Sequence, residues 1–472
     1  MGVPATMIVT KPFESDAKFN AQGEGLEDLA VIVLPVNIVM DTQDIEKANL
    51  GDFVADEVIK ALIKEQPQTE TEAAEGETIQ FSGGEYTEAW ENMEKYFLQH
   101  RWSDGFPLVP PTQAAVSRML EGTELSPDHV VGLIEPSCAE ATVRKIAINA
   151  VMAGCLPQHM PVILAAVEAI SDPLFDLHGI QTTTGPVSPL LIVSGPKLIE
   201  KLNINDSYST IGPGWRANTT IGRAIRLIMI NIGLAWPGKN DMKAFGNPFK
   251  YVTLMAENED AYLGSWEPIR VAEGFSLNDM TISVMPAVGF PVQYMMDDEC
   301  NIDRIIELLT DAALGKYNRS VHGWGLEDLI LLTPGTFEYI WREGFSRIEF
   351  QKKLYESLQM PSRKFFANSR TSRPDPTEFV SIEKNPKWLA EKCEECKKNP
   401  EALFPMHAKP ENIKIIVAGG PGTTLMAYVS NWIGRCHFVT KPVKLPKNWD
   451  NLLDKYKGWE TPIIRSKGGV MK

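Results

Sequence analysis

The sequence contains little cysteine and no long uninterrupted hydrophobic segment. Six cysteines in 472 residues are too few for a disulfide-bonded scaffold and are typical of a reducing compartment. The longest apolar stretches, 160–170 and 227–236, are shorter than the roughly 18 residues that a membrane span requires, and the first residues do not resemble a signal peptide. We therefore expect a soluble, cytoplasmic protein.

Basic residues are also in deficit. The chain has 46 Lys and Arg against 61 Asp and Glu, which gives a formal charge of −15. No cluster of basic residues interrupts this acidic background, and an acidic surface repels phosphate backbones and anionic headgroups. The composition therefore argues against nucleic acids and membranes as partners, and it is that of a globular protein of several domains.

The order of apolar runs and linkers predicts a multidomain protein of mixed α/β and α+β class. In residues 1–66, the apolar runs 5–10 and 29–34 resemble buried parallel strands, and 44–64 is an amphipathic helix. The further regions are an acidic linker (67–85), a central α+β substrate domain (86–335), a helical connector (336–410) and a C-terminal α/β unit (411–472).

Helix caps and chain breakers place the elements within these regions. We expect helices over 142–153, 160–170 and 221–232, strands over 189–194, 280–285 and 329–332, and a helical pair over 337–358 that begins anew at Ser346. In the C-terminal region we expect a strand at 413–418, the glycine loop Gly419–Gly422, a helix at 424–432 and a strand at 436–440, which is a βαβ-like order.

The N-terminal segment 2–65 carries a family resemblance. Residues 2–13, Gly-Val-Pro-Ala-Thr-Met-Ile-Val-Thr-Lys-Pro-Phe, with the apolar run 29–35 and the following helix, resemble the second half of the (seleno)protein family named for its U-G-S-C motif. In that family the first half carries a selenocysteine or cysteine in a Gly-Ser-Cys context. The resemblance implies half of a domain, completed by a second protein chain that supplies the reactive thiol or selenol.

The segment Asp176–Pro186 is the richest in chemically useful side chains. It places His178 ahead of Thr182, Thr183 and Thr184, whose hydroxyls can hold an anionic or carbonyl ligand. His178 is a candidate acid, base or metal ligand. The alternative is a hydroxyl-rich turn that caps a helix.

A second candidate site follows at Ile211–Ile221, Ile-Gly-Pro-Gly-Trp-Arg-Ala-Asn-Thr-Thr-Ile, which leads into a helix that carries Arg223 and Arg226. Glycines, arginines and a helix N-terminus together form sites for carboxylate, phosphate or sulfonate. The expected substrate-binding residues are Trp215, Arg216 and Asn218. The loop is neither a Walker A loop nor a dinucleotide fingerprint, so the sequence indicates no nucleotide cofactor. The alternative is an internal ion pair for Arg216.

Cys138 is the cysteine best placed for chemistry. It precedes the predicted helix at 142, whose N-terminus would favour a thiolate, whereas Glu140 nearby opposes it. The alternative is an inert structural cysteine. Cys393 and Cys396 form a C-x-x-C pair on a charged segment that we expect to be a solvated helix without a redox role.

Two carboxylates offer a third candidate, a divalent metal site. Glu257 and Glu259 fall on one side of an extended chain, and Glu267 follows shortly after. A metal-dependent hydrolase would need at least three of His178, Glu257, Glu259 and Glu267 within coordination reach. The alternative is a solvated acidic surface.

Together these features predict a subunit of a heteromeric enzyme. The reaction would be thiol- or selenol-dependent bond cleavage or reduction of a small polar anionic substrate, catalysed by a lyase or an oxidoreductase. His178 and Cys138 are the candidate catalytic residues, and the partner chain supplies the reactive Cys or selenocysteine. The alternatives are a non-catalytic ligand-binding or scaffold subunit and the metal-dependent hydrolase. Convergence of His178, Arg216 and Cys138 in one pocket would favour the enzyme.

Overall fold

The computed structural model describes most of the chain, in two compact units, Met1–Ser82 and Gly83–Lys472. The described residues are 5–14, 17–18, 21, 29–34, 50–63, 78–251, 254–262, 264–296, 300–314, 327–365, 387–422, 424–432 and 436–459. Most of the predicted linker 67–85 lies outside them.

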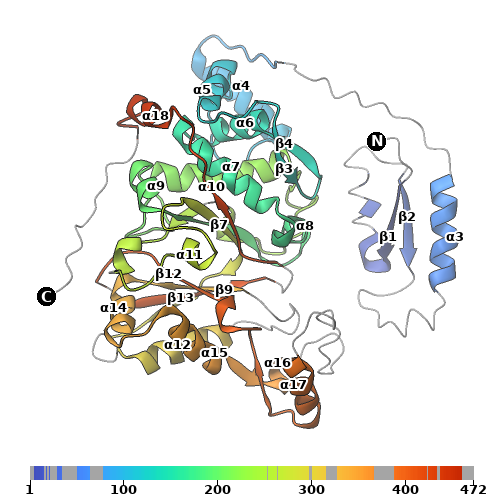
Figure 1. Ribbon diagram of the computed structural model, residues 1–472. Helices are drawn as coiled ribbons and strands as arrows, with labels where there is room; N and C mark the ends of the chain where they lie inside the picture. Colours follow the sequence, from blue (N-terminus) through green and yellow to red (C-terminus); the bar gives the residue numbers. More distant parts are fainter. Residues whose placement is uncertain are drawn as a thin grey trace. The chain divides into compact units, whose positions relative to one another are not determined.

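The first unit contains two parallel strands and a helix (Figure 1). Strand β1 (Thr6–Thr10) pairs in parallel with β2 (Ala30–Leu34), and helix α3 (Leu50–Ile63) follows. The two predicted strands are confirmed, and so is the part of the predicted helix that the structure describes. Ile32 of β2 is buried, as expected for a strand residue on the face that packs against a helix.

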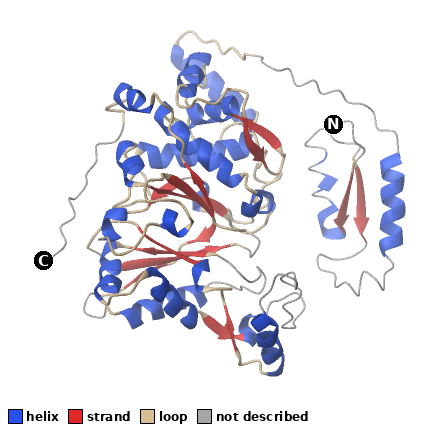
Figure 2. Cartoon of the chain, viewed as in Figure 1, coloured by secondary structure: helices blue, strands red, loops and turns tan. Residues whose placement is uncertain are grey.

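The second unit is built on strands and helices that alternate along most of the chain (Figure 2). Its helices are α4 (Tyr86–Gln99), α5 (Gln113–Leu120), α6 (Val143–Ala153), α7 (Met160–Ile170), α8 (Leu177–Thr182), α9 (Pro196–Lys201), α10 (Arg216–Asn231), α11 (Ile269–Ala272), α12 (Ile302–Leu314), α14 (Pro334–Arg342), α15 (Arg347–Ser357), α16 (Ser362–Phe365), α17 (Lys387–Lys398) and α18 (Trp449–Lys455). Its strands are β3 (Val130–Ile134), β4 (Ala139–Thr142), β5 (Ser188–Ser194), β6 (Leu254–Ala256), β7 (Thr281–Gly289), β8 (Val292–Tyr294), β9 (Asp328–Leu332), β10 (Gln359–Pro361), β11 (Leu403–Pro405), β12 (Ile413–Val417), β13 (Leu425–Asn431) and β14 (Val439–Pro442).

The main sheet of this unit has the strand order β12-β9-β13-β7-β5-β6, with β14 beside β7 and β8 beside β13. β13 links two halves of the sheet, one formed by β12 and β9 and the other by β7, β5 and β6. It pairs with β9 along most of its length and with β7 at its last two residues. At the opposite ends of the sheet, Asn258 N, just beyond β6, donates to Val417 O of β12 at 2.8 Å. The sheet therefore bends back on itself.

The inner face of this bent sheet forms one apolar core. Every strand of the main path contributes to it, at alternate positions, as a pleated strand requires. The strand members of this core are Leu190, Ile192, Met255, Met285, Ala287, Leu329, Leu331, Ile416, Ala427 and Val429. Strands such as β5, whose residues are all buried, need apolar side chains on both faces, which explains their continuous apolar sequence.

Helices cover the outer faces of the two halves. Helix α7 packs against β7 and β14, while α12, α14 and α15 pack against β13, β9 and β12 (Figure 1). The long helix α10 packs against α6 and α7. Among the residues that the structure describes, no helix has the length and apolar character needed to cross a bilayer.

Several helix predictions are confirmed together with their caps. Helix α6 begins after Thr142, whose hydroxyl accepts from Lys145 N, and ends at Gly154, which has a φ of +86°. Helix α15 begins at Ser346, which forms a capping box with Glu349. The mixed α/β class is likewise confirmed, because helices and several sheets are interleaved in the structure.

In the C-terminal region the strand predicted at 413–418 is confirmed as β12, whereas the predicted helix and the separate βαβ-like unit are wrong. Residues predicted as a helix at 424–432 form strand β13, and β14 begins at Val439. β12, β13 and β14 belong to the same sheet as β5, β7 and β9, so 411–472 is not a separate βαβ-like unit, and 86–335 is not a domain on its own. A central strand that is buried on both faces lacks the alternation that marks a strand in sequence.

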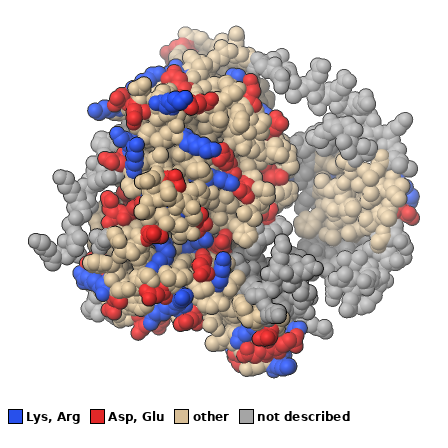
Figure 3. All heavy atoms as spheres, viewed as in Figure 1, with Lys and Arg blue, Asp and Glu red and all other residues tan. Residues whose placement is uncertain are grey.

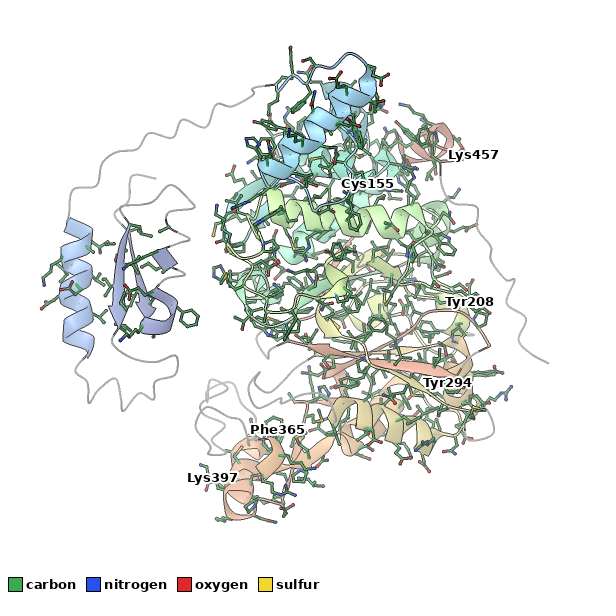
Figure 4. The ribbon with its side chains drawn as sticks, turned by 180° about the vertical axis from the view of Figure 1, so that it is seen from behind. Cys155, Tyr208, Tyr294, Phe365, Lys397 and Lys457 are labelled. Atoms are coloured by element: carbon green, nitrogen blue, oxygen red, sulfur yellow. The ribbon has the colours of Figure 1, made fainter. Side chains whose placement is uncertain are left out.

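The predicted connector contains a small lobe formed by β10, β11, α16 and α17, which includes Phe365 and Lys397 (Figure 4). β10 and β11 are antiparallel partners. Helix α17 was predicted, but its cysteines are not solvated: Cys393 and Cys396 are both buried in a second apolar core, which also contains residues of α12, α14 and α15. The C-x-x-C pair therefore packs as two small apolar side chains.

Candidate functional site

The turn between β3 and β4 carries two groups with reactive potential, Glu135 and Cys138. The Glu135–Pro136 peptide is cis, and Cys138 has a φ of +55°. Ser137 fixes this turn on the C-terminal end of α10, because its hydroxyl donates to Ile232 O at 2.7 Å. Cys138 is exposed, whereas Cys155 and Cys436 are buried.

Helix α8 brings His178 to this turn. Asp176 caps the helix: its Oδ1 accepts from Gly179 N at 3.2 Å. Its Oδ2 accepts from Cys436 Sγ at 3.7 Å, which joins α8 to the segment that precedes β14. His178 projects from the first turn of this short helix, and its side chain is 60% exposed.

One carboxylate oxygen joins the two candidate catalytic residues. Glu135 Oε2 lies 3.2 Å from His178 Nδ1 and accepts from Cys138 Sγ, also at 3.2 Å. Residues 43 positions apart are thus brought together by the docking of α8 on the β3–β4 turn. Because Nδ1 faces the carboxylate, the other ring nitrogen of His178 is left to exchange protons with a ligand.

Cys138 is not activated as a nucleophile in this arrangement. The hydrogen bond to Glu135 raises the pKa of the Cys138 thiol, and burial and the carboxylate charge act in the same direction. The expectation that the helix after Cys138 favours a thiolate was therefore wrong. The thiol lies in a turn, one strand away from α6, and a carboxylate beside it outweighs a distant helix dipole.

The three threonines after His178 have local structural contacts. Thr182 Oγ1 donates to His178 O at 2.9 Å, and Thr183 Oγ1 accepts from Gly185 N at 3.0 Å. Thr184 O accepts from Ala244 N at 3.2 Å. The contacts of Thr182 and Thr183 are those of a hydroxyl-rich turn at a helix end, which is the alternative interpretation that the sequence offered for this segment, whereas that of Thr184 is a backbone hydrogen bond to a distant segment.

Arg216 does not join this group. Its Nη1 donates to Gly154 O at 3.2 Å, and its guanidinium lies 5.8 Å from the ring centroid of Trp459. Trp215 is the N-cap of α10, and its side chain forms no cap hydrogen bond. The predicted convergence of all three residues in one pocket is therefore not observed: His178 and Cys138 meet at Glu135, while Arg216 contacts other residues, and none of the three lines a described cavity.

Asn218 has a structural role. It is fully buried, its Oδ1 accepts from Asn205 N at 2.7 Å, and its Nδ2 lies 3.3 Å from the acceptors Asn205 O, Thr210 O and Leu254 O. All polar atoms of its side chain are therefore used within the fold. The prediction that Asn218 binds substrate is contradicted, because nothing is left to face a ligand.

The predicted metal site is also contradicted. Glu257 is buried and accepts from Tyr262 OH at 2.5 Å and from Ser194 Oγ at 2.6 Å. Glu259 is paired with Arg270 and accepts from Gly195 N. Within the described residues, which include Glu267 and His178, no three His, Cys, Asp or Glu side chains are placed to hold a metal ion. The carboxylates instead join β5, β6 and β12, because Tyr262 OH also accepts from Val417 N.

The glycine loop Gly419–Gly422 is confirmed as a loop, and the ring of Tyr208 lies against it. A Cβ on Gly420 would lie 2.0 Å from the Tyr208 ring, and Tyr208 OH donates to Pro421 O at 2.9 Å. Gly420 is therefore needed because an aromatic ring lies against its backbone.

Sequence reasoning missed the role of Glu135. It lay within the segment that drew attention to Cys138, yet its partner His178 is distant in sequence. The surface gives little further guidance, because acidic and basic side chains are intermixed over the face of the second unit drawn in Figure 3.

The chain matches no known protein-family model, and no curated protein sequence matches it significantly. The resemblance of residues 2–65 to the UGSC-motif family therefore stays a prediction.

Proposed function

We propose that this chain is the acid–base subunit of a heteromeric enzyme that cleaves or reduces a small polar anionic molecule. The observation that carries the proposal is the shared hydrogen bonding of Glu135 Oε2 with His178 Nδ1 and Cys138 Sγ, each at 3.2 Å. A carboxylate on one ring nitrogen orients an imidazole, as in many general acid–base sites.

The roles follow from exposure and charge. His178 exchanges a proton with the substrate through Nε2, because its side chain is largely exposed and Nδ1 is held by Glu135. Cys138 remains a neutral thiol, because the adjacent carboxylate raises its pKa, so it donates a hydrogen bond or a proton. The nucleophilic thiolate or selenolate then comes from the partner chain that completes the N-terminal unit.

The test compares single variants in the complex reconstituted with its partner, on a panel of small carboxylates and sulfonates followed by NMR. His178→Gln should lower the rate about 10² to 10⁴-fold, since it removes general acid–base help. Cys138→Ser should retain most of the rate. His129→Gln is the matched control, because His129 is an exposed histidine at the other end of the β3–β4 hairpin.

Near-normal turnover in His178→Gln together with loss of activity in Cys138→Ser would contradict the assignment and make Cys138 the thiol of the reaction. A chain that is active alone, as a monomer by native mass spectrometry, would contradict the partner requirement. Melting temperatures of all variants show whether a lost rate reflects lost folding.

A further inference from the structure

A cluster of buried charges lies against α8 and is formed by one arginine of α10 and three residues of the segment that connects α10 to β6. We call Arg226, Lys243 and Lys250, together with Asp241, the buried cation cluster. Arg226 is 6% exposed, and the side chains of Lys243 and Lys250 are 1% and 16% exposed. Charged side chains at such depth normally occur only with full compensation by opposite charge.

The compensation in this cluster is incomplete. Asp241 accepts from Lys250 Nζ and, at 3.3 Å, from Lys243 Nζ. Arg226 donates from Nε to Lys250 O and from Nη2 to Ser188 Oγ, each at 3.1 Å, and neither acceptor is charged. Among the described residues, Asp241 is the only carboxylate that pairs with any of the three cations.

A neighbouring acid does not make up the difference. The charge of Asp104 also acts on Arg226, but both oxygens of this carboxylate already accept from Arg223, Oδ2 from Nε at 2.7 Å and Oδ1 from Nη2 at 2.8 Å. The cluster thus has three cations for one carboxylate of its own. Burial consequently lowers the pKa of Lys243 to about 8 and that of Arg226 to about 10.

Unpaired hydrogen-bonding groups lie beside the excess charge. The hydrogen bonds of Arg226 are made by Nε and Nη2. Gln181 of α8 is 1% exposed, and both Oε1 and Nε2 of its side chain lack a hydrogen-bond partner among the residues that the structure describes. Lys243 Nζ connects the two regions, because it donates to Gln181 O at 3.2 Å and to Ile180 O at 2.7 Å.

There is also open space on the same segment. A cavity of about 530 Å³ is lined by Asn247, Pro248, Phe249, Val288, Phe290 and Ser430; no residue of the cluster lines it, but Phe249 directly precedes Lys250 in the chain. Asn247 Nδ2 donates to Pro186 O at 2.6 Å, which attaches this wall to the loop after α8. A small molecule with one charged end and an otherwise apolar body fits such surroundings.

We propose that the buried cation cluster binds the oxyanion group of the substrate, a carboxylate, sulfonate or phosphate, with Arg226 and Lys250 as its donors, while Lys243, whose N–H groups are used within the fold, contributes its charge. This inference rests on the proposed function only in naming the anion as part of the substrate. Gln181 lies three residues after His178, which is about 4.5 Å along a helix axis, so α8 connects the anion site to the acid–base site.

The experiment is calorimetric titration of the full-length chain with inorganic phosphate and, separately, with acetate, in a phosphate-free buffer. We expect saturable binding. Lys250→Met should weaken it about tenfold to a hundredfold, the equivalent of one charge-assisted hydrogen bond. Lys201→Met removes an equal charge from an exposed lysine of α9 and should leave the affinity unchanged.

A second variant tests the charge imbalance itself. Gln181→Glu would supply a carboxylate where the structure has an unpaired amide, so it should raise the melting temperature and abolish phosphate binding. Absence of saturable binding to the wild-type chain, or equal affinity in Lys250→Met and Lys201→Met, would overturn the proposal. So would a lower melting temperature in Gln181→Glu. Because binding is measured without turnover, its failure leaves the test of His178 intact.

Discussion

Glu257 offers the sharpest test of how the bent sheet is held together. Its Oε1 accepts from Tyr262 OH at 2.5 Å and from Ile269 N at 2.9 Å, and its Oε2 accepts from Ser194 Oγ at 2.6 Å. In Glu257→Ala two of these buried donors lose their acceptor, while Ser194 retains Glu259 at 3.3 Å. At about 1 to 3 kcal/mol for each orphaned donor, the free energy of unfolding should fall by about 2 to 6 kcal/mol.

Glu257→Gln separates hydrogen bonding from charge. The amide oxygen can still accept from Tyr262 and Ile269, so the expected loss is only about 1 kcal/mol. Burial raises the pKa of Glu257 above its unfolded value, so the folded state holds the proton more tightly. This carboxyl therefore favours folding most below about pH 4.3, its unfolded pKa, and that contribution is lost as pH rises through the folded pKa.

Urea unfolding followed by circular dichroism at pH 5 and pH 8 measures both effects. The penalty of Glu257→Gln relative to wild type should shrink at pH 8, because the amide has no charge to desolvate. If Glu257→Gln destabilised the protein as much as Glu257→Ala, or if the penalty grew with pH, the assignment of Glu257 as a buried acceptor that joins β5, β6 and β12 would be wrong.

Three further outcomes are expected. Cys138 should react slowly with iodoacetamide at pH 8, as measured by mass spectrometry. Glu135→Gln should speed this alkylation, because removal of the carboxylate lowers the raised pKa of the thiol. An unchanged rate of alkylation in Glu135→Gln would contradict the hydrogen bond between Glu135 and Cys138. Asn218→Ala should lower the free energy of unfolding by about 3 to 5 kcal/mol in urea titrations, since its buried partners lose their hydrogen bonds, whereas normal stability with weakened ligand binding would return Asn218 to the substrate site. Gly420→Ala should lower the free energy of unfolding by about 1 kcal/mol, because the new methyl group displaces Tyr208. Addition of Tyr208→Ala should then raise the melting temperature of Gly420→Ala part of the way back to that of the wild type. If it does not, the strain lies at another contact of Gly420.

Elements with local signals could be predicted from the sequence. Helix α6 has a threonine before it and a glycine after it, and helix α7 begins with a proline in its first turn. Strand β5 is a short apolar run closed by glycine and proline. Strand β13 has no such signal, because both its faces are buried and its apolar residues do not alternate with polar ones.

The candidate site depends on contacts that no local pattern encodes. His178 and Cys138 were identified by residue type, but the carboxylate between them is brought in by the docking of α8 on a turn 43 residues earlier. The imbalance of the buried cation cluster is likewise visible only in three dimensions, since Arg226 is on a helix and Lys243 in a later loop. Conversely, Asn218 has the residue type of a ligand-binding group, yet the fold uses all its polar atoms.

The position of β13 between β9 and β7 has a consequence for synthesis of the chain. The strands β5, β6 and β7 leave the ribosome well before Leu425–Asn431. The edge of β7 therefore stays unpaired until β13, about 140 residues later in the chain, has been synthesised. During that interval the nascent chain exposes an apolar strand edge that can pair with other chains. Production of this protein should therefore depend on how quickly the ribosome reaches β13, and on chaperones that shield the edge until it does.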